Sequence, residues 1–383
     1  MPPVTLPSVC ALEPVLWFLL SLPVFVYTIH QKPHSRWPLL PLNIVPPIQC
    51  YRTVNRLNDT APGLDWLWAF TSLIYILHST SALYVQQWTL SESDQKARSD
   101  WNLHAACRAW LNARRLPRKS ISPVAITLGE RIRFTGRKIF LLLFLALLYM
   151  SSEIFILLVL DPQPEDFQPV QRSHFHFRPD RAAVVRALFA LQWAWLTCLI
   201  LTVANSLVAV FFVAIIKLDA PEEWTPLFGN PLEAYSLRRF WGIFWHKLGS
   251  PAQVEYGRLL ADRILGLRPG GGAEKTFIAL WVFVVSGLVH GLVAWKTEPE
   301  QDARPWGDMK FLLVNFIGGL AEVIVARGVS LMRSNGGRVS PEGKMLGFLW
   351  VFLFFYCTVP EYQYPTLQRT AEMRAPMMRV RSL

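Results

Sequence analysis

The sequence predicts an all-α, polytopic integral membrane protein with about seven or eight transmembrane helices. The chain has 383 residues, of which 52% are hydrophobic and only 17% are charged, and its mean hydropathy is positive. Soluble domains are usually about 45–50% apolar and about 25% charged. The composition therefore excludes a secreted disulfide-rich domain, a disordered chain and an ordinary cytosolic enzyme.

Long uncharged runs predict the individual helices, because a bilayer core of about 30 Å requires about 20 apolar residues. Four runs have this length and at most one charged residue: 66–85, 139–160, 187–216 and 276–295. Two shorter runs, 311–326 and 345–360, are also expected to span. The run 15–29 has no basic region or cleavage site beside it, which predicts a retained span. The proline-rich run 37–50 predicts a short, broken or re-entrant helix.

The basic residues predict the orientation. Lys and Arg exceed Asp and Glu by 38 − 27 = 11, and the segment 86–138 alone contains eleven basic and four acidic residues, a balance of +7. Cytoplasmic loops are enriched in Lys and Arg, so this loop is predicted to be cytoplasmic. The segments 161–181 and 296–310 are then lumenal, and 217–275 is cytoplasmic. The membrane accounts for the positive charge, and we expect no nucleic-acid partner.

Within the basic loop, apolar residues recur at helical spacing over 103–111, and Arg108, Arg114 and Arg115 lie between or beyond them. This pattern is typical of an amphipathic helix on an anionic leaflet. A solvated loop that only sets the topology is the alternative. The five cysteines are far apart and form no C-x-x-C pair, so we expect neither a disulfide framework nor a metal site.

Four regions follow from these runs and from the motifs described next. They are the N-terminal spans and basic loop (1–138), the central spans (139–216), a motif-bearing region (217–360) and a C-terminal tail (361–383).

His290 is the strongest catalytic candidate. An ionisable group inside an apolar membrane helix costs free energy, so its presence there indicates a function. It lies in the otherwise apolar run 276–295. Ser286 is four residues earlier and so on the same helix face, and Gly287 leaves room for a substrate or a neighbouring backbone. A desolvated imidazole is neutral, which suits a general base. A histidine that only bonds a carbonyl of a neighbouring helix is the alternative.

A second motif follows Phe228-Gly-Asn-Pro and occupies 235–247. If 236–247 is helical, Phe240, Trp241, Phe244 and Trp245 form one broad aromatic face. The functional interpretation is that this face lines a tunnel. An interfacial helix at the membrane boundary is the alternative.

The polar residues of the same motif then have separate expected roles. Arg238 or Arg239 would meet phosphate, and His246 would point at the reacting centre.

These motifs together resemble the wax synthase branch of the membrane-bound O-acyltransferase family. The resemblance rests on Phe-Trp-x-x-x-Trp-His at 240–246 and Ser-Gly-x-x-His at 286–290, and it is concentrated in residues 222–295. It implies transfer of an acyl group from acyl-CoA to an alcohol inside the membrane, without a permanently bound cofactor.

The resemblance also implies roles for single residues. His290 matches the family's catalytic histidine, and Ser286 matches its small polar neighbour. His246 stands where related acyltransferases have an asparagine. Gly291 departs from the glutamate that follows the histidine in many relatives, so an orienting partner for His290 must come from another helix, with Glu322 or Glu153 as candidates.

Fungal members of this branch acetylate terpenoid or meroterpenoid alcohols, which favours acetyl-CoA as donor and an enzyme of secondary metabolite biosynthesis in the endoplasmic reticulum. A wax synthase acting on long-chain alcohols is the alternative within the family. A polytopic transporter and a catalytically inactive membrane scaffold are the alternatives from other classes. The pattern does not define the acceptor alcohol, the acyl chain length or the oligomeric state.

Overall fold

Every regular element in the described residues is a helix, which confirms the predicted all-α class. The computed structural model describes residues 12–57, 63–90, 102–115, 126–172, 178–297, 306–332 and 339–381. The chain forms two compact units, each built from two segments. The first unit contains residues 1–117 and 247–316, and the second contains 118–246 and 317–383.

Six helices in the described part of the chain are long and apolar enough to cross a membrane, in agreement with a polytopic protein. They are Glu13–His30, Leu128–Leu160, Arg181–Ile215, Gly272–Thr297, Trp306–Ala326 and Pro341–Arg374. The predicted span 66–85 lies on a 17-residue α-helix, Leu64–Thr80, that continues as a π-helical turn, Ser81–Val85. The proline-rich run 37–50 forms mainly a short helix, as predicted, so the total of seven or eight spans stays a prediction.

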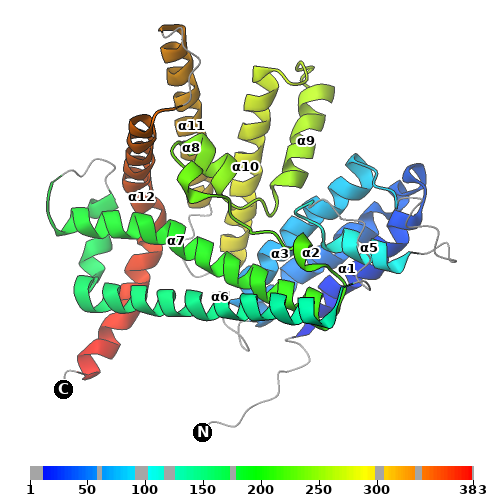
Figure 1. Ribbon diagram of the computed structural model, residues 1–383, viewed down its shortest axis with the longest axis horizontal. Helices are drawn as coiled ribbons and strands as arrows, with labels where there is room; N and C mark the ends of the chain where they lie inside the picture. Colours follow the sequence, from blue (N-terminus) through cyan, green and yellow to red (C-terminus); the bar gives the residue numbers. More distant parts are fainter. Residues whose placement is uncertain are drawn as a thin grey trace. The chain divides into compact units, whose positions relative to one another are not determined.

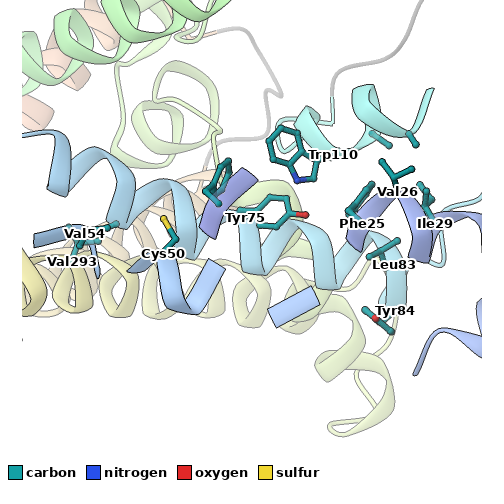
Figure 2. Packing of buried hydrophobic residues seen from close by; sticks show 14 residues of the cluster. Phe25, Val26, Ile29, Cys50, Val54, Tyr75, Leu83, Tyr84, Trp110 and Val293 are labelled. Atoms are coloured by element: carbon teal, nitrogen blue, oxygen red, sulfur yellow. The ribbon is translucent and has the colours of Figure 1, made fainter. Parts of the chain in front are cut away.

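The first unit is assembled from helices that are far apart in the sequence (Figure 1). They are α1 (Glu13–His30), α2 (Leu40–Thr53), α3 (Leu64–Thr80), α5 (Leu103–Leu111), α9 (Ser250–Arg263), α10 (Gly272–Thr297) and the start of α11 (Trp306–Met332). Figure 2 shows the apolar core that joins several of them. The core includes Phe25 and Ile29 of α1, Cys50 of α2, Tyr75 of α3 and Val293 of α10.

The helix predicted in the basic loop is present as α5, with Asn102 as its N-cap. Its alanines and Trp110 are buried, whereas Leu103 and Leu111 are exposed. Trp110 Nε1 donates to Ser21 Oγ at 3.1 Å. This helix therefore packs its small-residue face on the first unit and leaves its leucines outward.

The second unit contains α6 (Leu128–Phe155), α7 (Arg181–Val210), α8 (Leu237–Arg239), the end of α11 and α12 (Pro341–Arg381). The predicted run 187–216 belongs to a 35-residue helix, Arg181–Ile215, that ends in a π-helical turn. At 1.5 Å per residue this helix is roughly 50 Å long, longer than the hydrocarbon core. A helix of this length must tilt, bend or extend beyond the membrane.

Candidate active site

Helices α9 and α10 form an antiparallel pair that positions the first set of predicted residues (Figure 1). Gly257 of α9 lies against Ile278 and Trp281 of α10, where an added Cβ would be 3.1 Å from the Trp281 ring. Further along the pair, Ser286 Oγ donates to Oε1 of the buried Gln253 at 3.2 Å. The first turns of α9 therefore lie at the level of Ser286. Gln253 is a polar neighbour of the motif that the sequence did not indicate.

His290 lies one turn beyond Ser286 on α10, as the spacing predicts. The rings of His290 and of Phe70 of α3 form a T-shaped pair, with 4.7 Å between the centroids. Nδ1 of His290 is 4.0 Å from Oδ1 of Asp308, at the start of α11. The His290 side chain is 40% exposed and that of Asp308 is 17% exposed, so the imidazole is partly accessible while the carboxylate behind it is covered.

A close crossing of α10 and α11 explains why Asp308 reaches His290. A Cβ added to Gly287 would be 2.9 Å from the Met309 Cα and 2.7 Å from its Sδ. Only glycine permits this approach without a shift of one helix. The prediction that Gly287 leaves room for a neighbouring backbone is confirmed, and that backbone is Met309, the residue after Asp308.

Asp308 and His290 have the arrangement of an acid–base pair in which a carboxylate orients an imidazole. At 4.0 Å the contact is an ion-pair distance and longer than a direct hydrogen bond. A carboxylate on the Nδ1 side favours the tautomer with the proton on Nδ1 and leaves Nε2 with its lone pair. The pair can therefore accept a proton at Nε2 from a bound hydroxyl group.

Glu322 and Glu153, the two candidates for an orienting partner, have other contacts in the second unit. Glu322 accepts hydrogen bonds from the backbone N–H groups of Leu237 and Arg238, at 2.7 and 3.1 Å. The indole N–H of Trp350 donates to it at 2.7 Å. Oε1 of Glu153 is 3.4 Å from the amide of Gln192. Glu322 is thus a helix cap in this structure, and its carboxylate occupies the positive end of α8.

The motif 235–247 begins as the predicted helix but ends sooner. Ser236 caps it by accepting from the Arg239 N–H at 3.2 Å, α8 covers only Leu237–Arg239, and a π-helical turn follows over Phe240–Phe244. Trp245 then has an extended backbone. Trp245 and His246 therefore leave the helix axis instead of continuing its face.

The two arginines of this motif have different environments. Arg239 pairs with Glu233, donates through Nε to the Glu233 carbonyl at 3.0 Å and stacks on Tyr235, 4.5 Å from the ring centroid. Arg238 is exposed. Of the pair predicted to meet phosphate, Arg239 also has a structural role in this loop, and Arg238 has the more accessible side chain.

The aromatic residues of the motif form a cluster with other helices of the second unit. Phe240 and Trp245 are buried and stack at 5.1 Å between ring centroids. Trp193 of α7 stacks on Trp245 at 5.3 Å, and Trp241 lies 5.3 Å from Trp245. Phe355 of α12 contacts Phe240 at 4.8 Å. Much of the aromatic face is therefore a packed core that holds the motif between α7 and α12.

His246 lies at the end of this cluster. Its ring contacts those of Phe228 and Trp245, with centroids 5.7 and 5.5 Å away. The Gly229 N–H donates to the Phe244 carbonyl at 2.8 Å, and a side chain at Gly229 would clash with the Ile243 carbonyl. The Phe-Gly-Asn-Pro segment is therefore fastened to the turn that precedes His246.

The predicted site residues thus fall into two groups. His290 and Ser286 belong to the first unit, and the remaining residues belong to the second, namely His246, Arg238, Arg239, Trp241 and Trp245. Within the residues that the structure describes, no group of three His, Cys, Asp or Glu side chains could hold a metal ion. The helices define a polytopic membrane protein, and His290 beside Asp308 is its candidate acid–base pair.

Part of the chain is similar to a known family. Residues 224–314 match the model of the membrane bound O-acyl transferase family. The matched stretch contains His246, Ser286, His290 and Asp308. The similarity to membrane-bound O-acyltransferases that the motifs predict is thereby confirmed. No solved structure matches the chain.

Several relatives are fungal acetyltransferases. The chain is 32% identical over 178 residues to acetyltransferase aurG of Calcarisporium arbuscula, covering 46% of this chain and 42% of that protein. It is 30% identical over 171 residues to acetyltransferase spyB of Aspergillus fumigatus, covering 41% of this chain and 28% of that protein. Acetyltransferase TRI7 of Fusarium sporotrichioides is 27% identical over 172 residues, covering 42% of this chain and 36% of that protein. The chain therefore spans less than half the length of each of these relatives.

Proposed function

We propose that the protein is an O-acetyltransferase that moves an acetyl group from acetyl-CoA to a hydroxyl of a hydrophobic alcohol, of terpenoid or meroterpenoid type. The observation that carries the proposal is His290 beside Asp308, on two helices that cross at Gly287 inside the family-matched stretch. The relatives named acetyltransferases support acetyl as the group transferred. The apolar helices supply a medium for a hydrophobic acceptor.

The chemistry follows from the properties of the two substrates. An alcohol has a pKa far above neutrality, so Nε2 of His290 takes the hydroxyl proton as the oxygen attacks the thioester carbonyl. The carbonyl π electrons move to its oxygen, and the C–S bond breaks when the tetrahedral intermediate collapses. The CoA sulfur leaves as a thiolate and takes the proton from the imidazolium. The products are the acetate ester and CoA, and His290 is neutral again.

The other residues have supporting roles in this proposal. Asp308 orients the imidazole, and the hydrogen-bonded pair of Ser286 and Gln253 places polar groups one turn from it. His246 is the proposed donor to the thioester oxygen. In the second unit, Arg238 and Arg239 with Trp241 and Trp245 are proposed to contact the donor.

The test is acetyl incorporation by membranes that contain the full chain. Membranes are incubated with labelled acetyl-CoA and a panel of terpenoid, sterol and long-chain alcohols, and with labelled palmitoyl-CoA in parallel. The proposal expects acetate esters of terpenoid alcohols. Palmitoyl esters of long-chain alcohols would favour a wax synthase instead. Failure across the whole panel would favour a transporter or an inactive scaffold.

Localisation is part of the proposal. The +7 loop faces the cytoplasm, where acyl-CoA is available, and the endoplasmic reticulum is the proposed membrane. Microscopy of the tagged chain beside a reticulum marker tests this, and a plasma-membrane pattern would contradict it.

A further inference from the structure

Arg115, just beyond α5, turns its guanidinium inward at the end of the described stretch 102–115. Its Nη2 donates to Ser81 Oγ at 2.7 Å, and its guanidinium carbon lies 5.1 Å from the centroid of the Trp88 ring. Nε and Nη1 are also buried, and neither has a hydrogen-bond partner among the residues that the structure describes. A guanidinium has five donors, so this side chain keeps donors for a further acceptor.

Arg36, in the same unit, shows which hydrogen bonds a purely structural arginine makes in this protein. It is fully buried, and its Nε, Nη1 and Nη2 each donate to a backbone carbonyl, at 3.0, 3.2 and 3.0 Å. Among the residues that the structure describes, no such set of carbonyls surrounds Arg115. Because a buried charge is costly unless it is paired, the difference indicates that an acceptor from outside the described chain completes Arg115.

The surroundings of Arg115 form a prepared site. The guanidinium lies over the Trp88 ring. The orientation of this ring is fixed because its indole N–H donates to the Gln86 side chain at 2.8 Å. Glu255 acts on Arg115 electrostatically, but its Oε1 is paired with Arg258 at 2.9 Å. Burial lowers the pKa of the Arg115 guanidinium, and the charge of Glu255 opposes this shift. An anion bound at Nε and Nη1 would likewise offset the free-energy cost of burying the Arg115 charge.

We infer that Arg115, held by Ser81 and Trp88, binds a phosphate group of the CoA part of the donor. Guanidinium groups match phosphate in charge and in forked geometry. The segment 102–115 also contains Arg108 and Arg114 and no acidic residue, which favours a multiply charged anion. The inference rests on the proposed function in naming CoA as the source of the phosphate. A phosphate of an anionic lipid headgroup offers the same chemistry, and the test separates the two.

The position of Arg115 relative to His290 agrees with a donor that stretches between them. Helix α3 and its π-helical turn pass both places, with Phe70 at His290 and Ser81 at Arg115. These two residues are eleven positions apart, which is about 16 Å along a helix axis. This distance is of the order of an extended pantetheine arm, which separates the thioester from the phosphates.

Polar groups of α9 line the same interval. Tyr256 OH donates to Thr80 Oγ1, next to Ser81, at 2.6 Å, and Gln253, one turn earlier on α9, bonds Ser286. A row of hydroxyl and amide groups therefore leads from the Arg115 site towards the catalytic histidine. Such groups suit the amides of a pantetheine arm.

The test measures equilibrium binding of CoA to the full chain in nanodiscs of zwitterionic lipid only. The variants are Arg115→Ala, Arg115→Lys and the matched control Arg263→Ala, which removes an exposed arginine from the neighbouring helix α9. The ligands are CoA, dephospho-CoA without the 3′-phosphate, and pantetheine without any phosphate. We expect Arg115→Ala to raise the Kd of CoA about 10-fold or more, the loss of one charge-assisted contact. The Kd of Arg115→Lys should lie between those of Arg115→Ala and the unchanged protein. The Kd of Arg263→Ala should stay within about 2-fold of that of the unchanged protein.

The ligand series identifies the phosphate. A defect of Arg115→Ala that disappears with dephospho-CoA assigns Arg115 to the 3′-phosphate, and one that persists assigns it to the pyrophosphate. Pantetheine should bind all variants equally. Normal CoA binding by both folded Arg115 variants overturns the inference. If thermal stability then rises with phosphatidylserine in an Arg115-dependent way, the phosphate belongs to lipid.

His290→Ala separates this inference from the proposed function. That variant should bind CoA normally and transfer the acetyl group about 10²- to 10⁴-fold more slowly. If the unchanged protein binds CoA through Arg115 but acetylates no alcohol, the proposed function fails and the phosphate site stands.

Discussion

Asp308 supplies the carboxylate that the sequence around His290 lacks. His290 and Ser286 could be predicted because they interrupt an apolar helix at a recognisable spacing. Asp308 could not, because it is one of four acidic residues in 296–310, a segment that the hydropathy pattern assigns to a loop. The structure begins α11 at Trp306, earlier than the predicted 311, and this extra turn carries Asp308 to His290.

Asp308→Asn should lower kcat by about 10- to 100-fold and leave the KM for both substrates nearly unchanged. The amide cannot hold the imidazole in the required tautomer, and the effect should be smaller than loss of the base itself, about 10²- to 10⁴-fold. Initial rates over a grid of donor and acceptor concentrations measure the effects on kcat and on KM separately. Asp308→Glu should restore part of kcat, and a defect confined to KM would rule out a positioning role.

Gly287→Ala should lower activity even though alanine favours a helix. Its Cβ would be 2.9 Å from the Met309 backbone, so α10 and α11 must separate, at a cost of about 1–3 kcal/mol. The separation also moves Asp308 away from His290. Gly319→Ala is the control, since an added Cβ there meets nothing within 4 Å. Equal activity of the two variants would show that the close crossing is unimportant.

The element that differs most from the sequence prediction is the motif helix of 236–247. The aromatic spacing correctly indicates a cluster, but it does not indicate that a π-helical turn ends the helix at Phe244. It also does not reveal the cap from Glu322, which is 85 positions from Leu237 in the chain. Long-range contacts of this kind are not visible in local periodicity. The motif is therefore held by α11 and α12 as much as by its own sequence.

Glu322→Ala should loosen this element. Loss of the cap should lower the stability of the detergent-solubilised protein by about 0.5–2 kcal/mol. Glu322→Gln keeps one acceptor oxygen and should lose less. Thermal unfolding followed by tryptophan fluorescence suits the measurement, because Trp245, Trp193 and Trp350 lie in or beside the cluster. Identical melting curves for all three proteins would contradict the capping role.

For the whole molecule, the basic loop and the hydropathy pattern predict the orientation in the membrane. The structure adds the contact between α9 and the membrane helix α10. The segment 217–275 was expected to be a cytoplasmic connection. Within it, helix α9 pairs with the membrane helix α10, so that Gln253 lies beside Ser286. Hydropathy could not predict this pairing, because α9 carries charged residues such as Arg258 and Arg263.

The orientation can be checked by labelling single cysteines in a cysteine-free background. Val170→Cys should be lumenal and Leu265→Cys cytoplasmic, and both positions are exposed, at 73% and 49%. In sealed microsomes, an impermeant maleimide should label Leu265→Cys at once and Val170→Cys only after detergent is added. The opposite pattern would invert the orientation and remove the cytoplasmic access of the Arg115 site to CoA.

The central claim is that His290 is the general base of an acetyl transfer. The most direct test is the rate at which membranes with His290→Ala transfer label from acetyl-CoA to an accepted alcohol, at expression matched to the unchanged protein. The account predicts a fall of about 10²- to 10⁴-fold with the protein still folded in the membrane. Transfer at the normal rate by the folded His290→Ala variant would contradict it.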